Sequence, residues 1–172
     1  MRPGEASMES EAPAGFSEKL AGSAHRRQSL RLWLRLFSCA TVVEKRIRNW
    51  LESEFGTTLP RFDALAAVER RRDGMTMSEL SGAMMVSNGN ATGIVARLVE
   101  DGLLVRTPDP EDARVTAVRL SPKGRAAFAR MAAAHAQWID EMFTDLTEDE
   151  VGELLRLLKK LRLSVEAHGT SP

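Results

Sequence analysis

The sequence is poor in the residues that most enzymes and metalloproteins use. It has one cysteine, three widely separated histidines and no tyrosine among its 172 residues. One cysteine cannot build a zinc cluster, and the sequence carries neither a glycine-rich phosphate loop nor a paired-histidine zinc motif. We therefore expect no enzyme activity, no metal site and no bound cofactor.

An excess of charge and a long apolar run are also missing. The 24 lysines and arginines balance the 24 aspartates and glutamates. Charged residues interrupt the helical segment 30–55 well before the roughly 20 apolar residues that a bilayer span needs. Residues 1–27 have no apolar run of the signal-peptide kind, and they are rich in proline, glycine and serine. We expect one folded core, a flexible tail at residues 1–27, a cytoplasmic location and no membrane partner.

Two helix starts lie close together in the middle of the chain. Thr76 and Glu79 form a capping box that predicts a helix from Met77. Ser87 is an N-cap for a second helix, which Gly102 ends. The side chains that we expect to be buried are Leu80, Ala83 and Met84 on the first helix and Ala91, Ile94, Val95 and Leu98 on the second.

The opposite face of the second helix carries two glycines, Gly89 and Gly93. Each glycine destabilises an exposed helix by about 1 kcal/mol relative to alanine. A close approach of another molecule to the backbone would explain their presence, and the floor of a DNA major groove fits that role because polar side chains here can bind base edges or phosphates. The alternative is a small-residue face that packs on another helix.

Two β-prone runs, 103–107 and 115–120, follow this helix and flank a turn rich in proline and acidic residues. A hairpin directly after a recognition helix is typical of a wing, and Arg114 at its tip would enter the adjacent minor groove. The alternative is an ordinary hairpin with a surface ion pair. The candidate DNA-binding residues are Ser87, Asn88, Gly89, Asn90, Thr92, Arg97 and Arg114.

The flanking segments predict four further helices, at about 30–55, 58–71, 122–144 and 148–167. The last one is so rich in leucine that its apolar residues cover more of its circumference than one neighbour requires. This favours a homodimer whose two recognition helices read half-sites about one helical turn apart. The alternative is a monomeric bundle that buries the same leucines.

The segment 76–121 resembles the MarR family of homodimeric bacterial winged-helix regulators. Ser87, Arg97-Leu98, Asp112-Ala113-Arg114 and Leu120-Ser121-Pro122-Lys123-Gly124 match family patterns, and the match extends over about residues 29–166. Gly93 departs from the family, since many members carry a polar or basic residue there.

The resemblance implies a mainly α fold with a small β-hairpin wing, a winged helix-turn-helix domain joined to a helical dimerisation region. The boundaries that we expect are a tail at 1–27, a dimerisation helix at 28–57, a DNA-binding region at 58–121, C-terminal dimerisation helices at 122–167 and a tail at 168–172.

The resemblance implies a ligand-responsive regulator of transcription, expected to be a repressor that binds double-stranded DNA in the nucleoid. Its small-molecule effector would bind among the first, second and fifth helices. Candidate effector-binding residues there are Trp33, Arg35, Arg46, Trp50, Phe62, His135 and Trp138. The alternatives are core packing for the tryptophans and solvation for the arginines.

Three segments, 32–36, 58–63 and 84–90, are similar to a MarR branch that controls hydroxycinnamate catabolism. The inducer of that branch is an aromatic acyl-CoA thioester, so we expect an aromatic acid or its CoA thioester as effector. Two other functions stay open: a redox-sensing regulator that uses Cys39, although burial of this cysteine in the first helix is the expectation, and a winged-helix module that binds protein.

Overall fold

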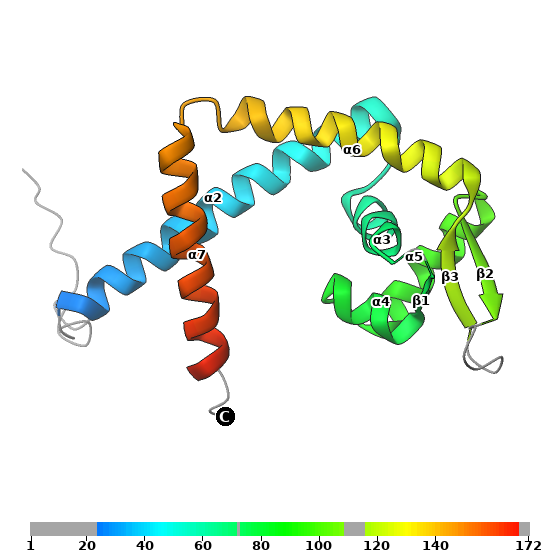
Figure 1. Ribbon diagram of the computed structural model, residues 1–172, viewed down its shortest axis with the longest axis horizontal. Helices are drawn as coiled ribbons and strands as arrows, with labels where there is room; N and C mark the ends of the chain where they lie inside the picture. Colours follow the sequence, from blue (N-terminus) through cyan, green and yellow to red (C-terminus); the bar gives the residue numbers. More distant parts are fainter. Residues whose placement is uncertain (1–23, 72, 109–115, 169–172) are drawn as a thin grey trace, which may run out of the picture. The chain divides into compact units, whose positions relative to one another are not determined.

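The computed structural model describes residues 24–71, 73–108 and 116–168. Its elements follow the predicted order of helices and wing strands (Figure 1). They are α2 (Ala24–Phe55), α3 (Leu59–Glu69), β1 (Met75–Thr76), α4 (Met77–Met84), α5 (Asn88–Glu100), β2 (Leu104–Pro108), β3 (Thr116–Leu120), α6 (Pro122–Met142) and α7 (Glu148–His168). The chain divides into two compact units, one ending at Glu44 and one beginning at Lys45. The mainly helical fold with a small β wing is as predicted.

The first unit contains the N-terminal part of α2. This helix begins at Ala24, earlier than the predicted residue 30, because residues 24–29 contain no glycine or proline that would stop it. The rings of Trp33 and Phe37 lie 5.8 Å apart, and both side chains are exposed. The other exposed large apolar side chains of this unit are Leu30, Leu32, Leu34 and Val42.

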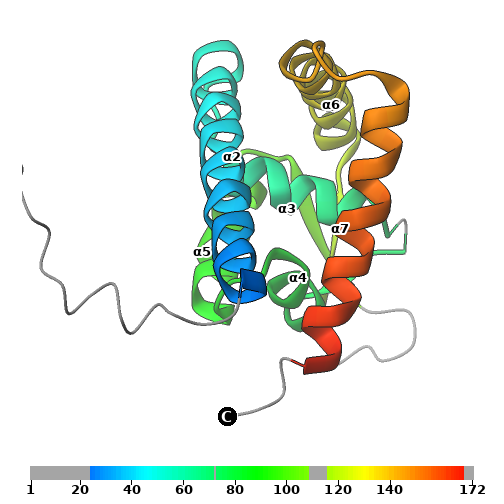
Figure 2. The ribbon, with the colours of Figure 1, turned by 90° about the vertical axis from the view of Figure 1, so that its left-hand side faces the viewer.

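The second unit is built around α3. Helices α4 and α5 pack on one side of α3, and α6 lies along another (Figures 1 and 2). The sheet is antiparallel with strand order β1-β3-β2, so the short strand β1 pairs beside the wing strands. The largest fully buried side chains of the core are Leu51, Leu65, Val68, Leu80, Val95, Leu98, Leu104 and Val118.

Most helix boundaries follow from local signals. The capping box of Thr76 and Glu79 is present, with the Thr76 N–H donating to the Glu79 carboxylate at 2.9 Å. This hydrogen bond is the main reason why the pKa of Glu79 is lowered. Gly56 and Gly102 adopt left-handed conformations after α2 and α5, with φ of +59° and +70°.

The predicted stripe of α4 is wrong at Ala83, which is exposed, and Met84 is only half-buried. Ser81 is buried instead, beside Leu80. Helix α4 has only eight residues, so packing against α5 determines which of its side chains are buried. The buried Ser81 hydroxyl is satisfied by its hydrogen-bond contacts with Ser78 and Asn88. On α5, Ala91, Val95 and Leu98 are buried as predicted.

The base of the wing is tied to the start of α6 by a close backbone contact. The Ser121 hydroxyl donates to the Gly102 carbonyl at 2.6 Å, and it accepts from the Gly124 N–H at 2.9 Å. A Cβ atom at Gly124 would lie 1.9 Å from the Leu103 carbonyl oxygen. The junction therefore requires glycine at position 124.

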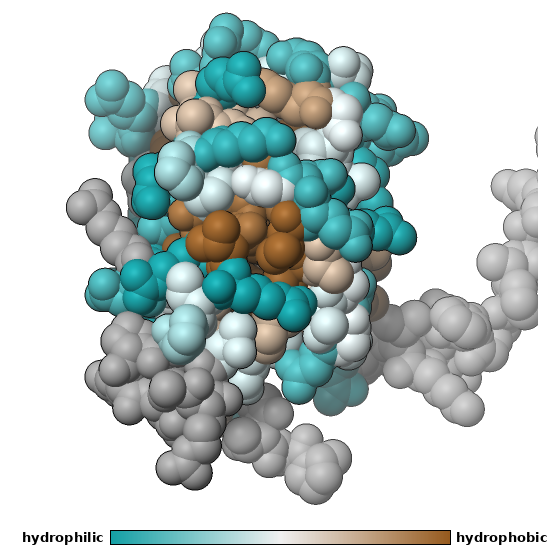
Figure 3. Space-filling model, turned by 90° about the vertical axis from the view of Figure 1, so that its right-hand side faces the viewer, coloured by the Kyte–Doolittle hydropathy of each residue, from teal (hydrophilic) through white to brown (hydrophobic). Residues whose placement is uncertain are grey.

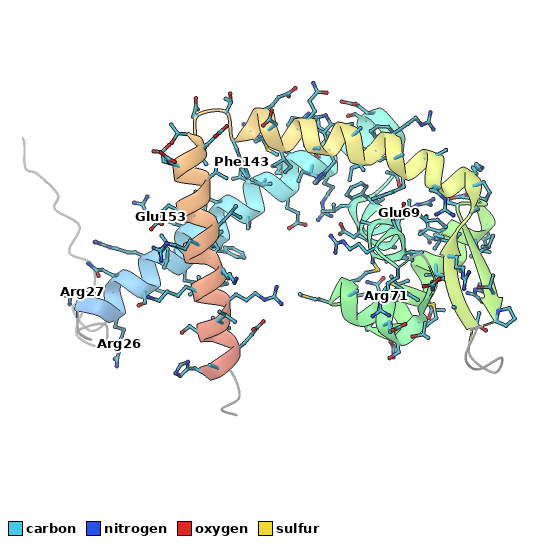
Figure 4. All side chains as sticks on the ribbon, viewed as in Figure 1. Arg26, Arg27, Glu69, Arg71, Phe143 and Glu153 are labelled. Atoms are coloured by element: carbon cyan, nitrogen blue, oxygen red, sulfur yellow. The ribbon has the colours of Figure 1, made fainter. Side chains whose placement is uncertain are left out.

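Ion pairs join α3 to its neighbours (Figure 4). Arg125 on α6 lies 3.8 Å from Glu69, and Arg71, just after α3, lies 3.0 Å from Glu79 on α4. Such exposed pairs add little stability, about 0 to 1 kcal/mol each.

Helix α7 differs from the other helices because none of its side chains is buried. A capping box begins this helix: the Thr147 N–H donates to the Glu150 carboxylate at 2.9 Å, and the Glu150 N–H donates to the Thr147 hydroxyl oxygen at 3.3 Å. Every helix in the described ranges is too short or too polar to cross a bilayer.

Candidate nucleic-acid interface

A left-handed turn sets the direction of α5. Met85, after α4, has φ of +54° and is 92% exposed. Ser87 then caps α5, its hydroxyl oxygen accepting the Asn90 N–H at 3.3 Å. The turn and the cap together fix where the second helix of the helix-turn-helix begins, as the sequence predicted.

The polar face of α5 is solvent-exposed over its first two turns. Asn88, Gly89, Asn90, Thr92 and Gly93 are all exposed, as is Arg97 further along the helix. Cβ atoms added at Gly89 and Gly93 would meet no described atom within 4 Å. Packing against another helix of the described chain therefore does not explain these glycines.

A hollow of about 400 Å³ lies beside this face. The start of α3 and the glycine face of α5 form its walls, and Arg97 stands at one side. Ile94 also lines it, which explains why this predicted core residue is only half-buried. The remaining lining residues are Gly56, Thr58, Pro60, Arg61, Gly89, Asn90 and Gly93.

Besides Ser87, two of the candidate side chains have partners within the protein. The Asn88 amide is hydrogen-bonded to buried Ser81, and the Thr92 hydroxyl donates to the Asn88 carbonyl at 2.8 Å. Asn90 and Arg97 make no side-chain hydrogen bond with the described part of the chain. Sequence reasoning missed Ser81, although a serine beside an apolar stripe was a signal for it.

The wing strands β2 and β3 stand next to the end of α5. Leu104 pairs with Leu120 and Pro108 with Thr116. The face of the molecule that carries this hairpin is mainly hydrophilic around one small apolar patch (Figure 3). Arg114, the predicted minor-groove residue, lies outside the described residues. Arg106 is an exposed cation of β2 that sequence reasoning did not single out.

The predicted effector-binding residues separate into groups. Phe62 on α3 stacks on His135 of α6 at 5.0 Å, and Phe128 lies 5.6 Å from Phe62. These three rings line a pocket of about 360 Å³ together with Ala66, Glu69, Arg70 and Ala132. Phe128, Glu69 and Arg70 were missed by sequence reasoning, since only the packing of α3 on α6 brings them to His135.

The tryptophans lie elsewhere. Trp50 and Trp138 pack at 5.3 Å, and Trp138 is only 6% exposed, which agrees with the alternative of core packing. Arg46 is exposed. Trp33 and Arg35 are exposed residues of the first unit.

The pocket around His135 changes the pKa of its imidazole. Burial lowers the pKa of its imidazole, and the nearby Asp63 carboxylate opposes that change. At neutral pH the ring is therefore uncharged and able to stack on an aromatic ligand. In the described ranges no cluster of three histidine, cysteine or acidic side chains is arranged for a metal ion.

Cys39 is exposed, which corrects the expectation of a buried structural cysteine. The apolar run around it lies on the exposed first unit of α2, so the hydrophobicity of its neighbours did not imply burial.

Comparison with known proteins identifies relatives of this chain by sequence and by fold. The sequence profile described as "MarR family" matches residues 55–115. The transcriptional activatory protein BadR of Rhodopseudomonas palustris is 29% identical over 144 residues, which are 82% of each protein.

Two solved structures are similar in fold to this chain over nearly their whole length. A MarR family transcriptional regulator from Silicibacter pomeroyi is 30% identical, with a TM-score of 0.71 over 84% of this chain and 99% of that one. A mutant MarR from E. coli complexed with operator DNA is 27% identical, with a TM-score of 0.68 over 81% of this chain and 99% of that one.

Proposed function

The chain belongs to the MarR family of DNA-binding transcriptional regulators, and from this premise we propose that it is a homodimeric repressor that an aromatic effector releases from a pseudo-palindromic operator. The open glycine face of α5 carries the proposal. Gly89 and Gly93 leave free space there, while Asn90 and Arg97 have no side-chain hydrogen bonds to the described chain.

In the proposed complex α5 lies in the major groove. The absence of Cβ atoms at the two glycines lets the helix backbone approach the base edges, and Asn90 and Arg97 reach bases or phosphates from either side. Ser87, Asn88 and Thr92 at the helix start complete the interface, and Arg114 of the wing supplies the minor-groove contact.

Dimerisation is proposed through the helices at both ends of the chain, residues 28–57 and 122–167. On α7 the apolar residues Val151, Leu154, Leu155, Leu158, Leu161 and Val165 form one stripe, of which all but Val151 are exposed in the single chain. A helix whose apolar stripe is uncovered needs a partner to be stable in water. A second copy of the chain provides it and also supplies the second recognition helix.

A charge in the middle of this stripe should separate the subunits. We expect Leu158→Glu to weaken dimerisation about tenfold or more, since a buried leucine contributes roughly 1.5–3 kcal/mol. Sedimentation velocity over a concentration series measures the change. Lys160→Glu, on the opposite side of α7, is the matched control and should remain dimeric; a dimeric Leu158→Glu protein would contradict this interface.

The proposed effector site is the pocket of Phe62, Phe128 and His135. Its volume of about 360 Å³ accommodates an aromatic ring, and Arg70 in its lining can bind an anionic group. A CoA moiety is too large for this volume and would extend to the surface, where an exposed arginine of the same unit, such as Arg46, can bind its phosphates. Because the His135 ring is neutral, it can stack on the aryl group without the free-energy cost of burying a charge.

Fluorescence anisotropy on DNA from the chain's own upstream region, with excess nonspecific competitor, tests the function. We expect competitor-resistant binding, and release by p-coumaroyl-CoA but not by p-coumarate. In Arg70→Gln we expect unchanged operator affinity and a weakened response to the thioester; Arg130→Gln, an exposed arginine of α6 that does not line this pocket, is the control. Specific binding without release would exclude p-coumaroyl-CoA as the inducer. Absence of specific binding would favour the alternative of a protein-interaction module.

Repression is tested separately, because the similar protein BadR is named as an activatory protein. A reporter gene placed downstream of the bound DNA should be expressed more strongly when the gene of the regulator is deleted. A decrease on deletion would mean that the chain is an activator.

The exposure of Cys39 favours a second candidate function, a redox-sensing regulator. If that function were correct, peroxide would release DNA from the wild type but not from Cys39→Ser. We expect instead that peroxide leaves the anisotropy of both proteins unchanged, because the neighbourhood contains no tyrosine to support a sensing thiol.

A further inference from the structure

Ser81 connects the two helices of the helix-turn-helix through a polar contact. It is one of only two buried polar residues in the described part of the chain, and it faces the start of α5. Its hydroxyl oxygen lies 2.9 Å from the Ser78 carbonyl oxygen, and it also contacts the side-chain oxygen Oδ1 of Asn88. Asn88 itself is exposed at the first position of the recognition helix.

Counting protons determines how the Asn88 amide is oriented. A serine hydroxyl has one proton, so Ser81 cannot donate both to the Ser78 carbonyl and to an amide oxygen. The amide oxygen and nitrogen have nearly the same shape, and their assignment follows from the hydrogen bonds they make. Both contacts become hydrogen bonds only if the Asn88 amide is turned by 180°, which exchanges Oδ1 and Nδ2. The hydroxyl then donates to the Ser78 carbonyl, and the Asn88 Nδ2–H donates to Ser81 Oγ.

This arrangement leaves the Asn88 Oδ1 directed away from Ser81. The described chain offers that oxygen no other partner, since the side-chain contact of Asn88 is the one with Ser81. The residue thus presents a hydrogen-bond acceptor at the surface of the recognition helix. Ser81, which is buried and touches no DNA itself, determines this orientation.

We propose that Ser81 is a positioning residue for base readout, which makes Asn88 present an acceptor oxygen to the major groove. The inference rests on the proposed DNA interface of α5. In the major groove adenine N6 and cytosine N4 are donors, whereas guanine N7 and O6 and thymine O4 are acceptors. The acceptor oxygen of Asn88, directed at the groove, therefore favours adenine or cytosine at one position of each half-site, while the second amide N–H stays available for a neighbouring acceptor.

The test is binding-site selection from a randomised duplex by the full-length protein, followed by sequencing. Asn88→Ala identifies the position, because the preference there is lost. Asn88→Asp should keep the preference for adenine or cytosine, because a carboxylate is also an acceptor and the Ser81 hydroxyl can turn to donate to it. The overall affinity of this variant falls, because the new charge is repelled by phosphates.

Ser81→Ala should reduce the discrimination at that position about fivefold, the effect of one hydrogen bond, and leave the other positions unchanged. Ser78→Ala, whose carbonyl is intact, is the matched control and should select the wild-type sequence. A general loss of stability would weaken binding at all positions alike, so a change at one position distinguishes positioning from a structural role.

Two results would overturn the inference while the proposed function stands. One is a shift of Asn88→Asp toward guanine or thymine, and the other is an unchanged preference in Ser81→Ala. If the wild type selects no sequence from the pool, the proposed function fails together with the inference.

Discussion

Gly124→Ala is expected to be the most destabilising alanine substitution among the glycines that the structure describes. The new Cβ would lie 1.9 Å from the Leu103 carbonyl oxygen and 2.8 Å from its carbon, both backbone atoms. Relief of this clash must separate the wing base from α6. The shift strains the Gly124–Ser121 and Ser121–Gly102 hydrogen bonds, which contribute about 1 kcal/mol each.

Together with the cost of overpacking, the free energy of unfolding should fall by about 3 kcal/mol or more. Chemical denaturation at a fixed protein concentration measures it. Gly82→Ala is the control, since no described atom lies within 4 Å of a Cβ there, and it should raise stability by up to about 1 kcal/mol. Wild-type stability of Gly124→Ala would contradict this account of the junction.

Gly93→Ala should produce opposite changes in stability and in DNA affinity. Its Cβ enters open space, so helix propensity predicts a gain of about 1 kcal/mol in the free energy of unfolding. The same methyl group would keep the backbone of α5 away from the groove floor. We expect operator affinity to fall about tenfold or more, equivalent to one lost base contact.

Thermal unfolding and anisotropy at one fixed salt concentration measure the two quantities. Gly152→Ala on α7, where a Cβ also meets open space, is the control that should gain stability and keep its affinity. A Gly93→Ala protein that is more stable and binds the operator normally would show that this face of α5 is not the DNA interface.

The amino-acid sequence by itself determined the order of the elements and most of their ends. Thr76, Ser87 and Thr147 act as caps, and Gly56 and Gly102 end helices, because each signal acts within about four residues of backbone. The exposed polar face of α5 followed from helical periodicity for the same reason. These features identified the helix-turn-helix and wing before any tertiary contact was known.

The tertiary structure alone decided how side chains distant in sequence meet. Residues Phe62 and His135 stack because α6 packs on α3, and Gly124 is required because the wing base returns to the start of α6. Burial of Ser81 and exposure of Cys39 depend on which neighbour covers each helix, not on the residues beside them in the chain. Local patterns specify backbone conformation, whereas burial and side-chain partners depend on long-range packing, which these patterns do not contain.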